Sequence, residues 1–190
     1  MKRTTTLATI LVSVMLLQGC AAVVVGAGVG AAAVAHDRRT VGTQLDDKTL
    51  ASRISSALSE NASIKQHANI NAHVFNGTTL LVGQAPNDDL KRQAQRITEA
   101  QPHVSKLHNQ IRIGSPTATS TRSHDIWLAT KVRSKLLTDK SVDGLHIKVI
   151  VEDSEVFLMG LVTRQESNMA VEVTRNIEGV ARVVKAFEYL

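Results

Sequence analysis

Two segments of the chain carry apolar residues at every fourth position. The members of the two series are Leu50, Ile54 and Leu58, then Leu128, Val132 and Leu136. This spacing places the apolar side chains of each segment on one stripe of a helix. We therefore expect two amphipathic helices, over about 47–59 and 125–137.

Each of these helices opens a copy of one longer pattern. INAHVFNGTTLLVG (70–83) corresponds to IKVIVEDSEVFLMG (147–160), and each predicts a strand, a two-residue turn and a second strand. Asn76-Gly77 is a strong signal for a type I′ turn, whereas Asp153-Ser154 is a weaker one. The chain therefore contains an internal duplication.

The rest of each copy predicts one more helix and one more strand. The second helices are expected over about 87–100 and 164–177, and the last strands near 105–113 and 181–189. The order αββαβ indicates an α+β fold, with two helices on one face of a small three-stranded mixed sheet. Each copy has only about 65 residues, so its core is marginal alone and we expect the copies to dock on each other.

Glycines recur at matching places in the two copies. Apolar-Gly pairs occur at Val82-Gly83 and Met159-Gly160, and a Gly-Val-x-x-Val motif occurs at Gly179-Val180-Ala181-Arg182-Val183. These motifs resemble the BON domain of bacterial envelope proteins. The first copy carries His103 where the second glycine is expected, so we expect its final turn to differ.

The resemblance defines two tandem BON-type domains. We expect a first domain at 46–113, a linker at 114–123 (GSPTATSTRS) and a second domain at 124–190. Together with the leader described next, the chain is similar to outer-membrane lipoproteins with two BON domains. This similarity implies a non-enzymatic, periplasm-facing protein that binds anionic phospholipid and supports outer-membrane integrity.

The first residues have the features of a lipoprotein signal peptide, expected over 1–19. Lys2 and Arg3 precede an apolar stretch over 7–17, which is too short to span a bilayer. Cys20 follows Leu17-Gln18-Gly19, which resembles the bacterial lipobox, where the cysteine thiol receives a diacylglycerol. The alternative is a free thiol in an ordinary leader. Ala21 after the cysteine implies the outer membrane, since aspartate there is the usual retention signal of the inner membrane.

An apolar segment of small residues follows the cysteine, and we interpret 20–45 as a tether. Gly26, Gly28 and Ala31 match a dinucleotide-binding fingerprint, but the segment is too close to Cys20 for the valines before them to form a central strand. We therefore expect no nucleotide site.

The two copies differ on the outer face of their first helices. A helical wheel of the second copy puts Trp127, Thr130, Ser134 and Leu137 opposite the apolar stripe, between Lys131 and Arg133. Positions equivalent to Trp127, Arg133, Lys135 and Leu137 in the first copy hold Thr49, Ser55, Ala57 and Ser59. Because the copies share a fold, these differences need a cause other than folding.

This face is suited to a membrane surface. Residues 122–140 contain five basic and two acidic residues, a local charge of +3. We expect Trp127 and Leu137 to insert at the headgroup level of a phosphatidylglycerol-type anionic membrane, with Thr130 and Ser134 on the same face. Lys131, Arg133 and Lys135 would meet phosphates. The alternatives are that Trp127 packs between the copies, or that the helix docks a protein and the chain scaffolds envelope assembly or peptidoglycan remodelling factors.

Composition excludes several other classes of protein. The 190 residues are 43% hydrophobic but only 3% aromatic, and the single cysteine allows no intrachain disulfide and no cysteine-based zinc site. None of the seven histidines forms an HExxH motif, and neither a P-loop nor G-x-S-x-G occurs. Loss of Lys2 and Arg3 lowers the formal charge from +5 to +3, which does not favour nucleic acid. We expect no cofactor, no metal and no catalytic residues.

Overall fold

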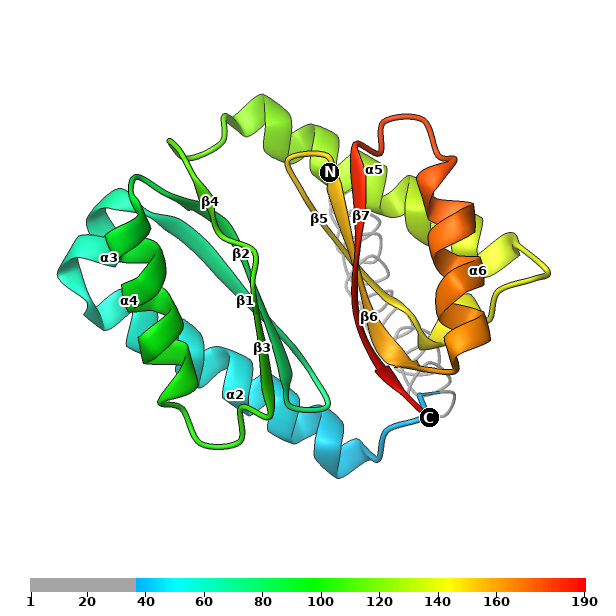
Figure 1. Cartoon of the computed structure of the whole chain (residues 1–190), viewed down its shortest axis with the longest axis horizontal. Coiled ribbons are helices and arrows are strands. Elements are labelled where there is room, and N and C mark those ends of the chain that lie inside the picture. Colours follow the sequence, from blue (N-terminus) through cyan, green and yellow to red (C-terminus); the bar gives the residue numbers. More distant parts are fainter. Residues whose placement is uncertain (1–36) are drawn as a thin grey trace, which may run out of the picture. The chain divides into compact units, whose positions relative to one another are not determined.

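The computed structural model describes residues 37–190 and forms one αββαβ unit from each copy of the repeat (Figure 1). The first repeat contains α2 (Val41–Glu60), α3 (Ala62–His67), β1 (Asn69–Phe75), β2 (Thr78–Ala85), α4 (Asp88–Glu99), β3 (Lys106–Asn109) and β4 (Arg112–Ile113). The second contains α5 (Thr119–Thr138), the 3₁₀ turn η1 (Gly144–His146), β5 (Lys148–Glu152), β6 (Glu155–Val162), α6 (Arg164–Arg175) and β7 (Arg182–Tyr189). The predicted α+β class is confirmed.

Both sheets are mixed, as the sequence predicts. In each repeat an antiparallel hairpin, β1–β2 or β5–β6, is joined by a final strand that runs parallel to the hairpin's second strand. In the first repeat that final strand is split into β3 and β4, which both pair with β2. The split occurs where the Asn109 side chain accepts a hydrogen bond from the Ile111 N–H at 3.2 Å.

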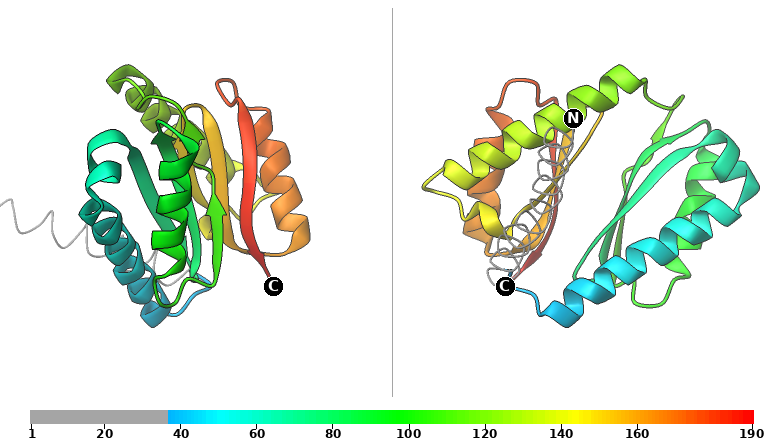
Figure 2. Two further views of the ribbon diagram at one scale, coloured as in Figure 1. Left: turned by 60° about the vertical axis from the view of Figure 1, so that its left-hand side comes forward. Right: turned by 180° about the vertical axis from the view of Figure 1, so that it is seen from behind.

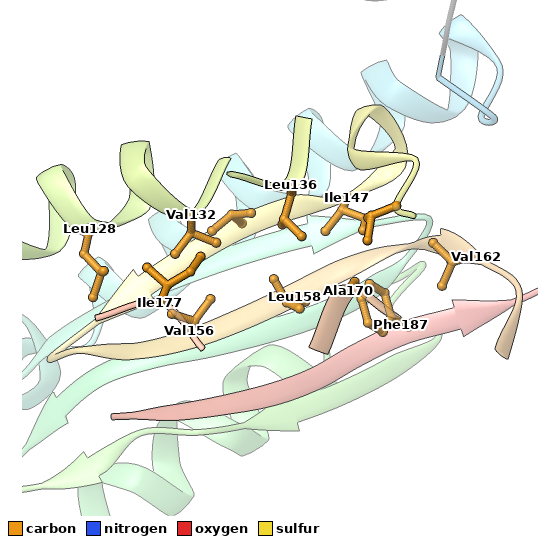
Figure 3. Packing of buried hydrophobic residues seen from close by; sticks show 12 residues of the cluster. Leu128, Val132, Leu136, Ile147, Val156, Leu158, Val162, Ala170, Ile177 and Phe187 are labelled. Atoms are coloured by element: carbon orange, nitrogen blue, oxygen red, sulfur yellow. The ribbon is translucent and has the colours of Figure 1, made fainter. Parts of the chain in front are cut away.

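One face of each sheet is covered by the two long helices of its own repeat, as Figure 2 shows from two further directions. In the second repeat Leu128, Val132 and Leu136 of α5 point toward the strands and pack in one cluster with residues such as Val156 and Leu158 (Figure 3). The equivalent residues of α2 pack in the same way on the first sheet. The predicted apolar stripes therefore build both cores.

The opposite faces of the two sheets pack on each other within the compact unit 38–190. This shared cluster consists of Phe75, Leu80 and Val82 from the first repeat and Ile150, Phe157, Met159 and Ala186 from the second. Polar contacts border the cluster: Glu188 accepts from the Thr78 hydroxyl at 2.5 Å, and Lys148 Nζ donates to the Val74 carbonyl at 3.1 Å. The two copies therefore do dock on each other, and they do so through their strands.

A buried aspartate on each first helix holds the hairpin turn of its repeat. Asp47 accepts from the N–H groups of Asn76 and Gly77 at 2.6 and 2.9 Å. Asp125 accepts from both N–H groups of the turn at 153–154, at 2.8 and 2.9 Å. A carboxylate with two such donors compensates the weaker turn sequence, and both residues of that second turn have positive φ.

The structure departs from the sequence-based expectations at the element boundaries. Helix α5 begins at Thr119, so the last five residues of the expected linker 114–123 are helical. Helix α2 begins at Val41, inside the expected tether. The prediction that the final turn of the first repeat differs from that of the second was wrong, because the backbone of His103 (φ 74°) adopts the same left-handed region as that of Gly179 (φ 99°).

The predicted features of the N-terminal segment lie outside the described residues. These are the signal peptide, the lipid-modified Cys20, most of the tether and the rejected fingerprint at Gly26, Gly28 and Ala31. Within the part that the structure describes, no helix is both long and apolar enough to cross a bilayer.

Candidate lipid interface

Helix α5 presents an apolar surface to solvent. Trp127 is 54% exposed and Leu137 is 55% exposed, whereas Leu128 and Leu136 beside them are buried in the core. Thr130 and Ser134 are exposed as well. The face that the helical wheel predicts to lie opposite the apolar stripe is therefore the solvent-facing side of α5.

Trp127 does not pack between the two repeats. Its ring lies 5.6 Å from the His124 ring, centroid to centroid, and Lys131 Nζ lies 4.8 Å from its centroid. Both contacts come from α5 itself, and the cluster between the sheets is built from strand residues. The alternative that Trp127 closes the interface between the copies was wrong.

The three predicted phosphate-binding cations of α5 have different partners. Lys131 Nζ donates to the Glu178 carbonyl at 3.0 Å and lies 3.7 Å from its carboxylate, and Lys135 Nζ lies 3.6 Å from Asp139 Oδ2. Hydrogen bonds from Ser141, with a smaller contribution from Lys135, lower the pKa of Asp139. Arg133 donates instead to the Val149 carbonyl at 2.8 Å. Of these three cations, only Arg133 has no carboxylate partner within the described residues.

Two exposed apolar side chains extend this face beyond the residues that the sequence predicted. Ile126 is 70% exposed next to Trp127, and Leu145 of η1 is also exposed. A Cβ on Gly144 would lie 2.5 Å from the Leu136 carbonyl oxygen, so this glycine lets η1 approach the end of α5 closely. Comparison of the copies could have found Ile126, because its counterpart in the first repeat is Lys48.

A groove runs along the outer edge of β5, between α5 and β1, with a volume of about 490 Å³. We call it the α5–β5 groove. Its lining includes the basic residues Arg122, Arg133 and Lys148 and the acidic residues Asp125 and Glu152. The sequence did not indicate it, because its walls come from three separate segments.

Burial shifts the titration of several groups in this groove. It lowers the pKa of His73 to about 4, an effect to which the neighbouring Lys148 ammonium adds, so His73 is neutral at pH 7. Burial also lowers the pKa of Lys148 and raises the pKa of Glu152. In the described region no three acidic, histidine or cysteine side chains gather as metal ligands.

Comparison with known proteins matches both repeats. The family model described as "BON domain" matches residues 46–115 and 124–190. The chain is 41% identical over 184 residues to "Outer membrane lipoprotein DolP" of Haemophilus influenzae, covering 97% of this chain and 95% of that protein. It is 38% identical over 154 residues to "21 kDa hemolysin" of Actinobacillus pleuropneumoniae, covering 81% and 79%. It is 23% identical over 146 residues to "Osmotically-inducible protein Y" of Escherichia coli, covering 75% and 72%.

Proposed function

Because the chain belongs to the BON domain family, we propose that it is an outer-membrane lipoprotein that binds anionic phospholipid through the exposed face of α5. The Haemophilus relative carries the name of an outer membrane lipoprotein, and the lipobox-like sequence before Cys20 supports the same location. A lipid anchor on Cys20 and two periplasm-facing BON domains would support outer-membrane integrity. None of the three relatives above is named as an enzyme, and we propose no catalytic role.

The observation that carries this proposal is that α5 exposes Trp127 and Leu137 where the duplicated helix α2 has polar residues. The exposed apolar residues of α2, Val41 and Leu45, lie before the point at which the repeat begins. The equivalents of Trp127 and Leu137 on α2 are Thr49 and Ser59, which are also exposed. The fold therefore does not require apolar residues at these positions. An exposed indole flanked by cations is suited to the headgroup region, where the ring is half wet and the cations meet phosphates.

Binding at this face would be weak by itself. Each basic residue near an anionic membrane contributes about 1 kcal/mol, and ion pairs such as that of Lys135 with Asp139 reduce the contribution. Acyl chains on Cys20 would hold the domains close to the bilayer and raise the effective concentration of lipid. The face therefore acts as a contact of a protein that is already anchored.

The fluorescence of Trp127 tests the proposal directly, since it is the one tryptophan of the chain. We use the chain without its first 20 residues, which retains every residue of the three apolar clusters. Phosphatidylglycerol vesicles should shift its emission to shorter wavelength, and brominated phosphatidylglycerol should quench it. Pure phosphatidylcholine should change little. Unchanged emission with phosphatidylglycerol would contradict the proposal and favour a protein-docking scaffold.

A further inference from the structure

The α5–β5 groove lies beside the exposed apolar face and shares residues with it. Ile126 and Thr130 line the groove. Both also lie on the solvent side of α5, and Ile126 directly precedes Trp127. A bilayer that receives Trp127 would therefore lie close to the mouth of this groove.

The floor of the groove offers backbone donors. The two-residue turn at 153–154 makes Glu152 and Glu155 a hydrogen-bonded pair. Hydrogen-bonded and non-hydrogen-bonded pairs alternate along an antiparallel ladder, so Val149 and Val151 belong to non-hydrogen-bonded pairs. Their backbone N–H and C=O groups therefore point away from β6. The bond from Arg133 to the Val149 carbonyl agrees with this pattern. The N–H groups of Val149 and Val151 thus point to the outer edge of β5. Outward N–H groups of this kind are frequent ligands of phosphate oxygens.

Three basic side chains line the same groove, and each is hydrogen-bonded to a neutral acceptor. Arg133 donates to the Val149 carbonyl, Arg122 to the Thr117 carbonyl at 3.2 Å and Lys148 to the Val74 carbonyl. None of the three has a carboxylate within 4.0 Å among the described residues, in contrast to Lys131 and Lys135. Arg and Lys carry five and three donors, so each retains donors for a ligand.

The two acidic residues of the groove are already engaged by protein donors. Asp125 accepts from both N–H groups of the turn at 153–154. Glu152 accepts from Gln84 Nε2 at 2.7 Å, and burial raises its pKa. Apart from the outward carbonyl of Val151, donors therefore predominate among the groups left for a ligand, and this favours an anion over an amine.

From these contacts we infer that the α5–β5 groove holds the phosphodiester of one phospholipid headgroup when α5 rests on the membrane. This inference rests on the proposed function and assigns the headgroup to one flank of the helix. Arg133 and the N–H groups of Val149 and Val151 supply the donors nearest to α5. Arg133, more than Lys131 or Lys135, then sets the preference for an anionic lipid.

The test compares Arg133→Gln with the matched substitutions Lys131→Gln and Lys135→Gln on the same helix. Binding of the chain without its first 20 residues is measured on phosphatidylcholine vesicles with and without phosphatidylglycerol. Phosphatidylglycerol should increase the vesicle affinity of Arg133→Gln about fivefold less than it increases that of the unaltered chain, which is the effect of removing one cation from an anionic surface. For the two lysine variants this difference should be less than about twofold because each lysine is already paired. Equal losses in all three variants would overturn the inference.

Amide NMR signals provide the second measurement. Phosphatidylglycerol micelles should shift the signals of Val149 and Val151 in the unaltered chain but not in Arg133→Gln, whose Trp127 emission should still respond to the micelles. Glycerol 3-phosphate at the same phosphate concentration should not shift either amide signal. It forms no micelle into which α5 could insert, so nothing brings its phosphate to the groove. Equal shifts with glycerol 3-phosphate would overturn the assignment to a membrane lipid. A Trp127 response with both amides unmoved in the unaltered chain would contradict this inference alone, and no Trp127 response would contradict the proposed function.

Discussion

A Trp127→Glu variant is expected to bind phosphatidylglycerol vesicles at least about 100-fold more weakly than the unaltered chain. The substitution removes the largest apolar group of the exposed face, whose burial in the bilayer contributes about 1.5–3 kcal/mol. It also places a carboxylate against an anionic surface, at a cost comparable to the 1 kcal/mol or so that one basic residue contributes. Sedimentation with vesicles measures the loss. Since Trp127 is 54% exposed, the variant should fold normally.

The internal duplication supplies the matched control. Thr49→Glu makes the same charge change at the equivalent exposed position of α2, and it should leave vesicle binding unaltered. If both variants lost vesicle binding equally, the effect would be a non-specific one of net charge. Full binding by Trp127→Glu would exclude this face as the membrane contact.

Replacement of Phe157 by alanine should destabilise the fold by about 3–5 kcal/mol, the usual range for a buried phenylalanine. Phe157 is only 1% exposed and lies in the cluster between the two sheets. Because this cluster joins the repeats, we expect the unaltered chain to unfold in one transition. The cavity left by Phe157→Ala should weaken the coupling and divide thermal unfolding into two transitions in calorimetry.

Leu158→Ala provides the comparison on the same strand. Leu158 is equally buried, but its side chain points to the helices of the second repeat (Figure 3). Its loss should lower the unfolding midpoint without dividing the transition. Two separate transitions in the unaltered chain would contradict the coupling of the repeats.

The fold could be predicted from the sequence wherever a local pattern determines an element. Apolar residues at every fourth position predicted α2 and α5, and the two matching segments 70–83 and 147–160 predicted the hairpins. The exposed face of α5 could also be predicted, because duplication reveals which differences folding does not require. Trp127 and Leu137 lie where that comparison placed them.

Contacts between distant segments could not be predicted. The aspartates that hold the hairpin turns act across about thirty residues, as in the bond of the Gly77 N–H to Asp47. The sequence showed Lys131 and Arg133 as similar cations, but Glu178, 47 residues away, pairs with Lys131 and not with Arg133. The groove likewise needs α5, β5 and β1 together. Periodicity within one helix contains no information about such partners.

An NMR titration shows which amides respond when α5 meets anionic phospholipid through its exposed face. The chain without its first 20 residues is titrated with micelles that contain phosphatidylglycerol, and amide shifts are mapped along the sequence. We expect shifts concentrated over residues 125–140 and the adjoining groove, with the amides of α2 unmoved. The absence of shifts over 125–140, or shifts of equal size along α2, would contradict this membrane contact of α5.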